Sequence, residues 1–230
     1  MTAILWSWAV AAAVVLALAS LLGTLVKLKP GPLGLLIDTR GRYSLNHLQL
    51  VVWSIVVISL IAGVFFGRLI EGVEDPLGFV IPDRVLGLLG ISVGAAVTVG
   101  AVKATKSATS AKAEPPTLAS YQVTQRTPFL GQVFLVEEGE FADEVVDATK
   151  FQSFLITIVL VVAYVAMAIN AIVNAKTAGA VTTLPDISGT FLVLLGISYA
   201  GYAGGKLPSQ TGAPAPAPPA APPSASGVPA

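Results

Sequence analysis

The sequence predicts an all-α integral membrane protein with five transmembrane helices: one N-terminal helix and two helical hairpins that repeat in parallel. Hydrophobic residues make up 54% of the 230 residues and charged residues only 11%, whereas a soluble domain carries about 25% charged residues. The pentapeptide Leu-Leu-Gly-Ile-Ser occurs at 88–92 and again at 194–198, each time a few residues after a Pro-Asp pair. Duplication of an apolar unit is typical of multi-pass membrane proteins.

Five apolar runs are candidates for membrane crossings, because about 20 apolar residues span a ~30 Å hydrocarbon core. The runs cover residues 3–26, 48–67, 85–102, 154–173 and 189–205, and the third and fifth are shorter and rich in glycine. They divide the chain into an N-terminal helix (1–28), a cytoplasmic juxtamembrane segment (29–47), a first repeat hairpin (48–103), a cytoplasmic loop (104–150), a second repeat hairpin (151–206) and a tail (207–230).

The first run also resembles a secretory signal peptide, since Ala17-Leu-Ala19 has the small-x-small form of a cleavage site. Residues 1–8 carry no basic side chain, however, and the apolar sequence continues to Val26. These features favour an uncleaved anchor, and removal of residues 1–19 stays open as the alternative.

The placement of basic residues predicts the orientation. If the N-terminus lies outside, ten of the 13 lysines and arginines face the cytoplasm, and only Arg68, Arg84 and Lys176 face out. We therefore expect the N-terminus outside and the C-terminus in the cytoplasm. Membrane-surface basic residues that can also attract anionic lipid are Lys27, Lys29, Arg40 and Arg42.

The loop and the tail carry most of the polar sequence. Within the loop, Gln132–Val136 has the composition of a strand. The acidic residues that follow are expected to be a solvated approach to the next helix: Glu137, Glu138, Glu140, Asp143, Glu144 and Asp147. The tail is uncharged and holds eight of the 16 prolines, which predicts a disordered Pro/Ala-rich segment. A docking segment for a proline-recognising partner is the other interpretation of the tail.

Small and polar residues recur at matching positions of the two hairpins. The residues Gly90, Gly94, Gly196, Ala200 and Gly204 stand at four-residue spacings, which lets helix backbones approach closely. We expect these faces to pack on each other or on a second copy of the chain, as in a homo-oligomer. The repeat polar positions Gln49, Gln152, Ser92 and Ser198 are expected to bond to neighbouring helices or to their own.

Several function classes are disfavoured by composition. The chain has no cysteine and one histidine, His47, and its net charge is zero, so we expect no metal site, no cofactor and no nucleic-acid partner. Gly90-Ile-Ser92-Val-Gly94 matches the nucleophile-elbow pattern, but that motif needs a strand–turn–helix and a histidine in reach. The helical rise places Ser92 about 18 Å from His47. We therefore predict no catalytic residue and no enzymatic activity.

The stretch from Asp38 to Trp53, which contains Ser-Leu-x3-Gln-x3-Trp, and the Leu-Leu-Gly-Ile-Ser helix followed by a lysine resemble uncharacterised bacterial multi-pass membrane proteins. The resemblance covers about residues 36–103 and 135–208, and the second copy departs from it with Ile156 in place of the tryptophan. It implies a setting in the bacterial plasma (inner) membrane and brings no activity with it.

Two functions are consistent with these features. The favoured one is a non-enzymatic membrane scaffold or anchor, surrounded by membrane lipids, that holds a cytoplasmic partner through the 104–150 loop or the tail. The alternative is a small oligomeric channel or facilitator for ions or uncharged solutes, with a neutral polar lining supplied by Ser92, Ser198, Asn170 and the tyrosines.

Overall fold

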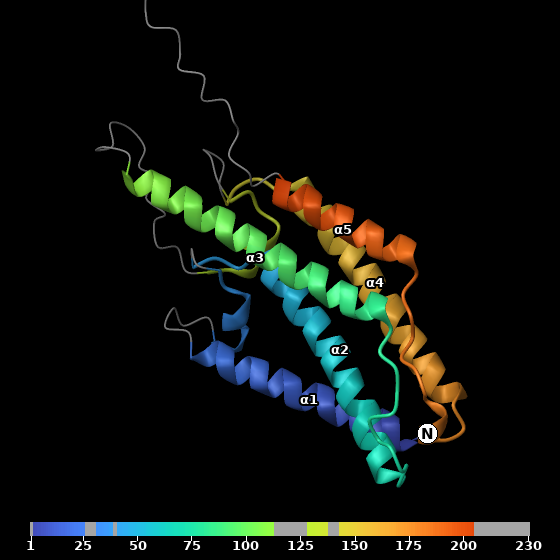
Figure 1. Cartoon of the computed structure of the whole chain (residues 1–230). Coiled ribbons are helices and arrows are strands. Elements are labelled where there is room, and N and C mark those ends of the chain that lie inside the picture. The colour runs from blue at the N-terminus through green and yellow to red at the C-terminus, as the bar shows by residue number, and fades with distance from the viewer. Residues whose placement is uncertain (1, 26–30, 39–40, 113–127, 138–142, 205–230) are drawn as a thin grey trace, which may run out of the picture.

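The computed structural model describes residues 2–25, 31–38, 41–112, 128–137 and 143–204, and for residues 2 and 104–112 only the helical backbone. The described chain is all-helical, as predicted, and Figure 1 shows its five α-helices. They are α1 (Thr2–Thr24), α2 (Leu45–Ile70), α3 (Asp83–Lys112), α4 (Ala148–Asn174) and α5 (Gly189–Gly204). Three short 3-10 helices accompany them: η1 (Gly31–Leu36), η2 (Leu130–Val133) and η3 (Ala178–Ala180).

Four of the helices are long and apolar enough to cross a membrane: α1, α2, α4 and the Asp83–Lys103 part of α3. The fifth, α5, is apolar but has 16 residues, and at 1.5 Å per residue it is about 24 Å long. Only 17% to 39% of the most apolar 18-residue stretch of each long helix is buried. Since the exposed remainder is largely apolar, the molecule has the surface of a multi-pass membrane protein.

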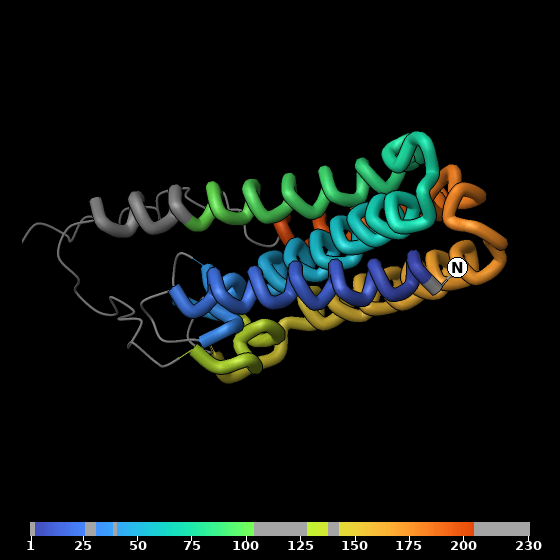
Figure 2. Tube along the Cα trace, turned by 90° about the horizontal axis from the view of Figure 1, so that it is seen from below, coloured from blue at the N-terminus to red at the C-terminus, as the bar shows by residue number. Residues whose placement is uncertain are grey.

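Successive helices alternate in direction, so the connecting segments gather at two ends of the bundle (Figures 1 and 2). One end holds residues 31–38, 41–44, 128–137 and 143–147 together with the ends of α1, α3 and α5; we call it the charged end. The other holds residues 71–82 and 175–188 and is called the opposite end.

The core lies between α2 and the other long helices. Trp53, Val57, Leu60 and Val64 form the buried stripe of α2, each 0–1% exposed. The Trp53 ring meets the ring of Tyr164 on α4 edge-on, with centroids 6.3 Å apart. From α3 and α5, residues such as Val85, Leu88 and Leu195 complete the cluster.

Helix α1 packs closely on α2 through two glycines. A Cβ at Gly63 would lie 2.6 Å from the Cα of Trp8, and one at Gly67 would lie 2.6 Å from Ile4 Cγ1. The Ser7 hydroxyl donates to the Gly63 carbonyl at 2.6 Å. Only glycine permits this approach, so Gly63-xxx-Gly67 is a small-residue contact between two of the long helices.

Two turns of matching geometry precede α2 and α4. Before α2, the Ser44 N–H donates to the Leu36 carbonyl at 2.8 Å, and the Asp38 N–H to the Arg42 carbonyl at 2.9 Å. Before α4 the corresponding bonds run from Asp147 to Phe134 at 2.8 Å and from Val136 to Val145 at 2.9 Å. Each turn follows a 3-10 helix and ends at the N-cap residue of the long helix, which is Ser44 for α2 and Asp147 for α4.

The strand expected over 132–136 is wrong. Residues 130–133 form η2, and beyond it Leu135 makes only an isolated bridge to Val146. The backbone turns because Val133 and Gln132 are buried against the end of the bundle, where the Gln132 Oε1 accepts from the Tyr43 N–H at 3.4 Å. Local composition favoured a strand, and tertiary burial overrode it.

Candidate functional site

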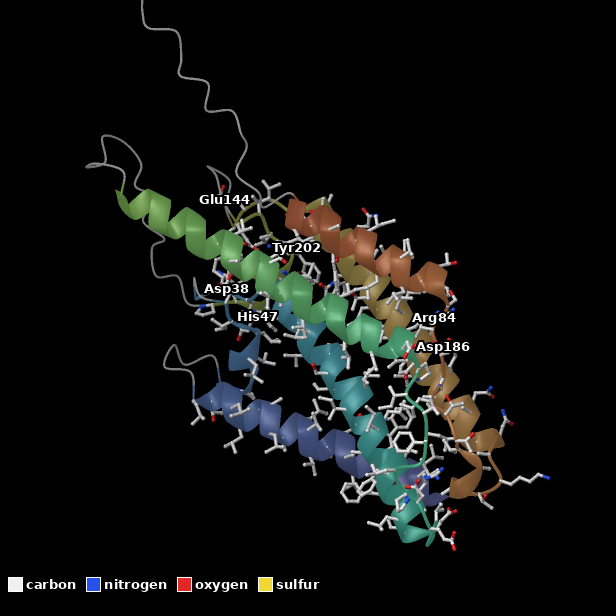
Figure 3. All side chains as sticks on the ribbon, in the orientation of Figure 1. Asp38, His47, Arg84, Glu144, Asp186 and Tyr202 are labelled. Atoms are coloured by element: carbon white, nitrogen blue, oxygen red, sulfur yellow. The ribbon has the colours of Figure 1, made fainter. Side chains whose placement is uncertain are left out.

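The charged end encloses ionisable side chains that are almost completely buried. The side chain of Lys150 is 0% exposed, and those of Lys103 and Glu137 are each 3% exposed. Charged side chains are rarely buried unless they are paired. Their ion pairs link α3, α4 and the two turns, which marks this cluster as the candidate functional site. Figure 3 labels Asp38 and Tyr202, which contact the same cluster.

Glu137 is the centre of the cluster. Its carboxylate lies 2.9 Å from the Lys103 ammonium and 2.8 Å from that of Lys150. The Tyr202 hydroxyl of α5 donates to the same carboxylate at 3.0 Å. One carboxylate therefore joins α3 to the first turn of α4 and the last turn of α5.

The neighbouring turn joins the same cluster through Asp38 and Arg42. The Lys103 ammonium lies 2.6 Å from the Asp38 carboxylate. The Arg42 guanidinium lies 2.7 Å from the Asp143 carboxylate and also donates to the carbonyls of Glu137 and Val136, at 3.3 and 3.4 Å. Among the described residues the cluster contains three basic and three acidic side chains, so it is electrically balanced.

Arg42 thus corrects the expectation of a membrane-surface basic residue. It is 7% exposed, and its donors are directed at oxygens of the second turn instead of lipid headgroups. Lys27, Lys29 and Arg40, which were grouped with it, lie outside the described residues. A buried guanidinium with planar donors is well suited to holding two chain segments together.

The acidic stretch before α4 is not the solvated approach that the sequence suggested. Glu137 and Asp143 are committed to the ion pairs above, and Asp147 caps α4 by accepting from the Thr149 and Lys150 N–H groups at 2.9 and 3.3 Å. Only Glu144 is exposed among the acidic residues described there, whereas Glu138 and Glu140 lie outside the described part. Capping of α4 positions Lys150 in its first turn, where its ammonium also donates to the Leu135 carbonyl at 2.7 Å.

Of the four repeat polar positions, Gln49 and Ser92 donate side-chain hydrogen bonds within the described chain, and Gln152 and Ser198 do not. The Gln49 side chain donates to the Ser153 carbonyl and hydroxyl and to the Thr157 hydroxyl of α4, at 3.2, 3.0 and 2.8 Å. Ser92 donates to the Leu88 carbonyl of its own helix at 3.0 Å. Gln152 is exposed, and the Ser198 hydroxyl is buried without a partner among the described residues. The expectation of cross-helix bonding is met at Gln49.

The predicted helix-packing residues on α3 and α5 do not lie in a close contact of the described chain. A Cβ built at Gly90, Gly94, Gly196 or Gly204 meets nothing within 4 Å, and Ala200 is exposed. Helices α3 and α5 do touch each other, and Leu88 and Leu195 belong to the same buried cluster; a Cβ at Gly87 of α3 would lie 3.4 Å from Leu192 Cδ2 of α5. These small residues therefore remain open to another molecule, which leaves the homo-oligomer a prediction.

A cavity of about 30 Å³ lies where α2 begins, beside the Asp38–Lys103 ion pair. It is lined by Asp38, Ser44, Asn46, His47, Ala96, Val99, Gly100 and Lys103. The side-chain amide of Asn46 is buried there with no hydrogen-bond partner in the described part of the chain, and the Ser44 side chain does not cap the helix. This volume and these polar atoms suit one or two water molecules.

The nucleophile-elbow pattern is not realised. Ser92 lies inside the continuous helix α3, so the strand–turn–helix that the motif needs is not formed. His47 is closer to this helix than expected, since it lines the cavity with Ala96, one turn beyond Ser92. Its Nδ1 lies 3.0 Å from the Ile37 carbonyl, so the ring is used to hold the first turn.

The opposite end is held by backbone carbonyls. Arg68 is 4% exposed and donates to the carbonyls of Val181 and Asp75 at 2.8 and 2.9 Å. The Ala178 N–H donates to the Glu71 carboxylate at 2.7 Å, and this hydrogen bond lowers the pKa of Glu71 below its usual value. Arg84 and Asp186 form an exposed ion pair at 2.6 Å.

No known protein family, curated protein or solved structure matches this chain. Within the described ranges, no three His, Asp or Glu side chains come together in a way that could hold a metal ion.

Sequence reasoning missed the cluster because Lys103, Glu137 and Lys150 are far apart in the chain and were counted as surface charges. A usable signal was present in Lys150 and Lys103, each a lone base directly beside an apolar run, with an acidic stretch between them. The Gly63-xxx-Gly67 spacing inside the second run likewise indicated a close helix contact, which is the one between α1 and α2.

Proposed function

We propose that the chain is a non-enzymatic multi-pass scaffold or anchor of the bacterial plasma membrane that holds a cytoplasmic partner. The supporting observation is the buried cluster around Glu137. It ties both turns to the ends of three helices, and its charges pair with one another. Such an arrangement produces a rigid platform from which the 104–127 segment and the 207–230 tail can present a partner site.

The proposed architecture has five crossings, with the N-terminus outside and the charged end in the cytoplasm. The two hairpins are proposed as copies of one unit. In support, Ser44 and Asp147 begin the long helices at the same spacing that separates Gln49 from Gln152. At the opposite end Val80 and Thr183, again at this spacing, form a parallel bridge, which is the pairing that a two-fold axis along the membrane normal would give.

The channel alternative has less support from the geometry. Its proposed lining residues do not share a surface within one chain, because Tyr164 is in the core at 1% exposure and Ser92 is bonded to its own helix. Asn170 faces outward and accepts from the Asn174 side chain at 3.0 Å. A pore would therefore require an assembly of several chains around another surface.

Affinity purification from gently solubilised membranes tests the scaffold. One variant replaces residues 113–127 with a Gly/Ser linker of equal length, a second ends at residue 206, and Arg84→Gln at the opposite end is the control. We expect one protein to co-purify in fixed stoichiometry with the full chain and with the control, and to be lost from one of the two shortened forms.

The scaffold would be contradicted if no protein co-purified with the full-length chain in fixed stoichiometry and if the chain carried solute across liposome membranes. The Ser92→Leu variant should then abolish this flux. That outcome would replace the scaffold with the channel.

A further inference from the structure

We propose that the described residues of one segment, 129–137 and 143–151, lie in the membrane interface with their outer face against lipid. The sequence had placed this stretch in an aqueous cytoplasmic loop. The inference concerns the folded segment itself and holds with or without a protein partner for the rest of the chain.

The first observation is an inverted polarity. The charged side chains of the segment, such as Glu137 and Lys150, are 3% and 0% exposed. Large apolar side chains point outward instead, with exposures of 43% to 59%: Phe129, Leu130, Val145, Val146 and Phe151. Among the residues described in this stretch, Glu144 is the one exposed charged side chain. A surface facing water has the reverse distribution, whereas a surface facing lipid has this one.

The second observation is continuity with the apolar surface of α4. Phe151, Leu155, Val159 and Val162 are all exposed and recur at three- or four-residue spacing, so they form one stripe along the helix. The stripe belongs to α4, which is long and apolar enough to cross a membrane. The outer face of the segment therefore extends a surface that already faces lipid, which favours lipid over a protein as its occupant.

The third observation is the length of α4. Its 27 residues are about 40 Å long at 1.5 Å per residue, against a hydrocarbon core of ~30 Å. When the helix is centred in the bilayer, its first turn reaches about 5 Å into the headgroup layer. The turn before α4 is bonded to that helix end, since the Asp147 N–H donates to the Phe134 carbonyl and Lys150 to that of Leu135. The segment is thereby held at interfacial depth.

Depth measurements with spin labels test this directly, because the chain has no cysteine. Single-cysteine variants Leu130→Cys and Val146→Cys of the full chain are labelled and reconstituted in vesicles of phosphatidylcholine and phosphatidylglycerol. Collision rates with oxygen, which concentrates in lipid, are compared with those of a water-soluble nickel chelate present on both sides. Val162→Cys in the span and Lys176→Cys in the opposite end are the lipid and water controls.

We expect the ratio of oxygen to nickel collision rates at 130 and 146 to lie between the high ratio at 162 and the low ratio at 176, as an interfacial depth requires. Nickel accessibility at 130 and 146 equal to that at 176 would overturn the proposal and leave the face free for a cytoplasmic protein. Low accessibility to both reagents would also overturn it, since the face would then be covered by a second copy of the chain. Both test positions are exposed, and each reports independently if the other variant fails to fold.

Discussion

Replacing Glu137 with glutamine removes the charge at the centre of the buried cluster with little change in shape. The carboxylate pairs with Lys103 at 2.9 Å and Lys150 at 2.8 Å and accepts from Tyr202 at 3.0 Å. Asp38 still neutralises Lys103 in the variant, whereas Lys150, which is 0% exposed, loses its ion pair with Glu137. Removing one partner of a buried ion pair costs about 3–5 kcal/mol, which is the expected loss in free energy of unfolding.

A double-mutant cycle separates charge from packing. Glu137→Gln combined with Lys150→Met restores electrical balance. The double variant should therefore lose about 2 kcal/mol less free energy of unfolding than the sum of the losses in the two single variants. The assay is reversible unfolding in mixed micelles, followed by circular dichroism. The matched control is Asp186→Asn, which breaks the exposed pair with Arg84, whose side chain is 53% exposed, and should cost about 0–1 kcal/mol.

The reasoning would be refuted if Glu137→Gln unfolds at the same denaturant fraction as the parent chain. It would also fail if the double variant costs the full sum of the single variants, because the two side chains would then act independently.

Four further predictions follow from the packing and the opposite end. Gly67→Leu should lower the free energy of unfolding by about 1–3 kcal/mol, because the larger side chain forces α1 away from α2. Gly196→Leu lies at an open position and should leave the stability of the monomer unchanged. If the small-residue faces assemble, this variant should reduce chemical crosslinking between chains. Gln49→Leu should cost about 1–2 kcal/mol in the same unfolding assay, since three hydrogen bonds to α4 are lost, and an unchanged midpoint would contradict this. Glu71→Gln should destabilise the chain slightly at neutral pH. Because the folded pKa of Glu71 lies below the ordinary value of a glutamate, the stabilisation is present above that ordinary value. It is lost as the pH falls through the folded pKa, so the unfolding free energies of the variant and the parent should converge there.

The helices were predictable because apolar runs of membrane length leave few alternatives. The first run, 3–26, corresponds to α1 at Thr2–Thr24, and the second, 48–67, lies inside α2 at Leu45–Ile70. The fourth was expected to begin near Phe154, but α4 begins at Ala148 because Asp147 caps it. Hydropathy detects the apolar part of a helix and not its polar first turns.

The site was not predictable in the same way. Hydropathy treats Lys103, Glu137 and Lys150 alike as outward-facing charges, whereas their burial depends on where the two turns fold back. Spacing alone was equally ambiguous for glycine. Gly63 and Gly67 have the same separation as Gly90 and Gly94, and only the position of α1 makes the first pair a contact. Small-residue spacing identifies a surface that permits close approach but not the helix that occupies it.

The most direct test of the account is the sidedness of the two ends of the bundle. Topology reporters are fused within residues 113–127, at residue 230, and in the opposite end after Lys176. The account predicts that the first two report the cytoplasm and the third the outside, in agreement with one charged end built from both turns. Reporters at 113–127 and 230 on different faces of the membrane would contradict it, because the cluster around Glu137 would then have to be divided across the bilayer.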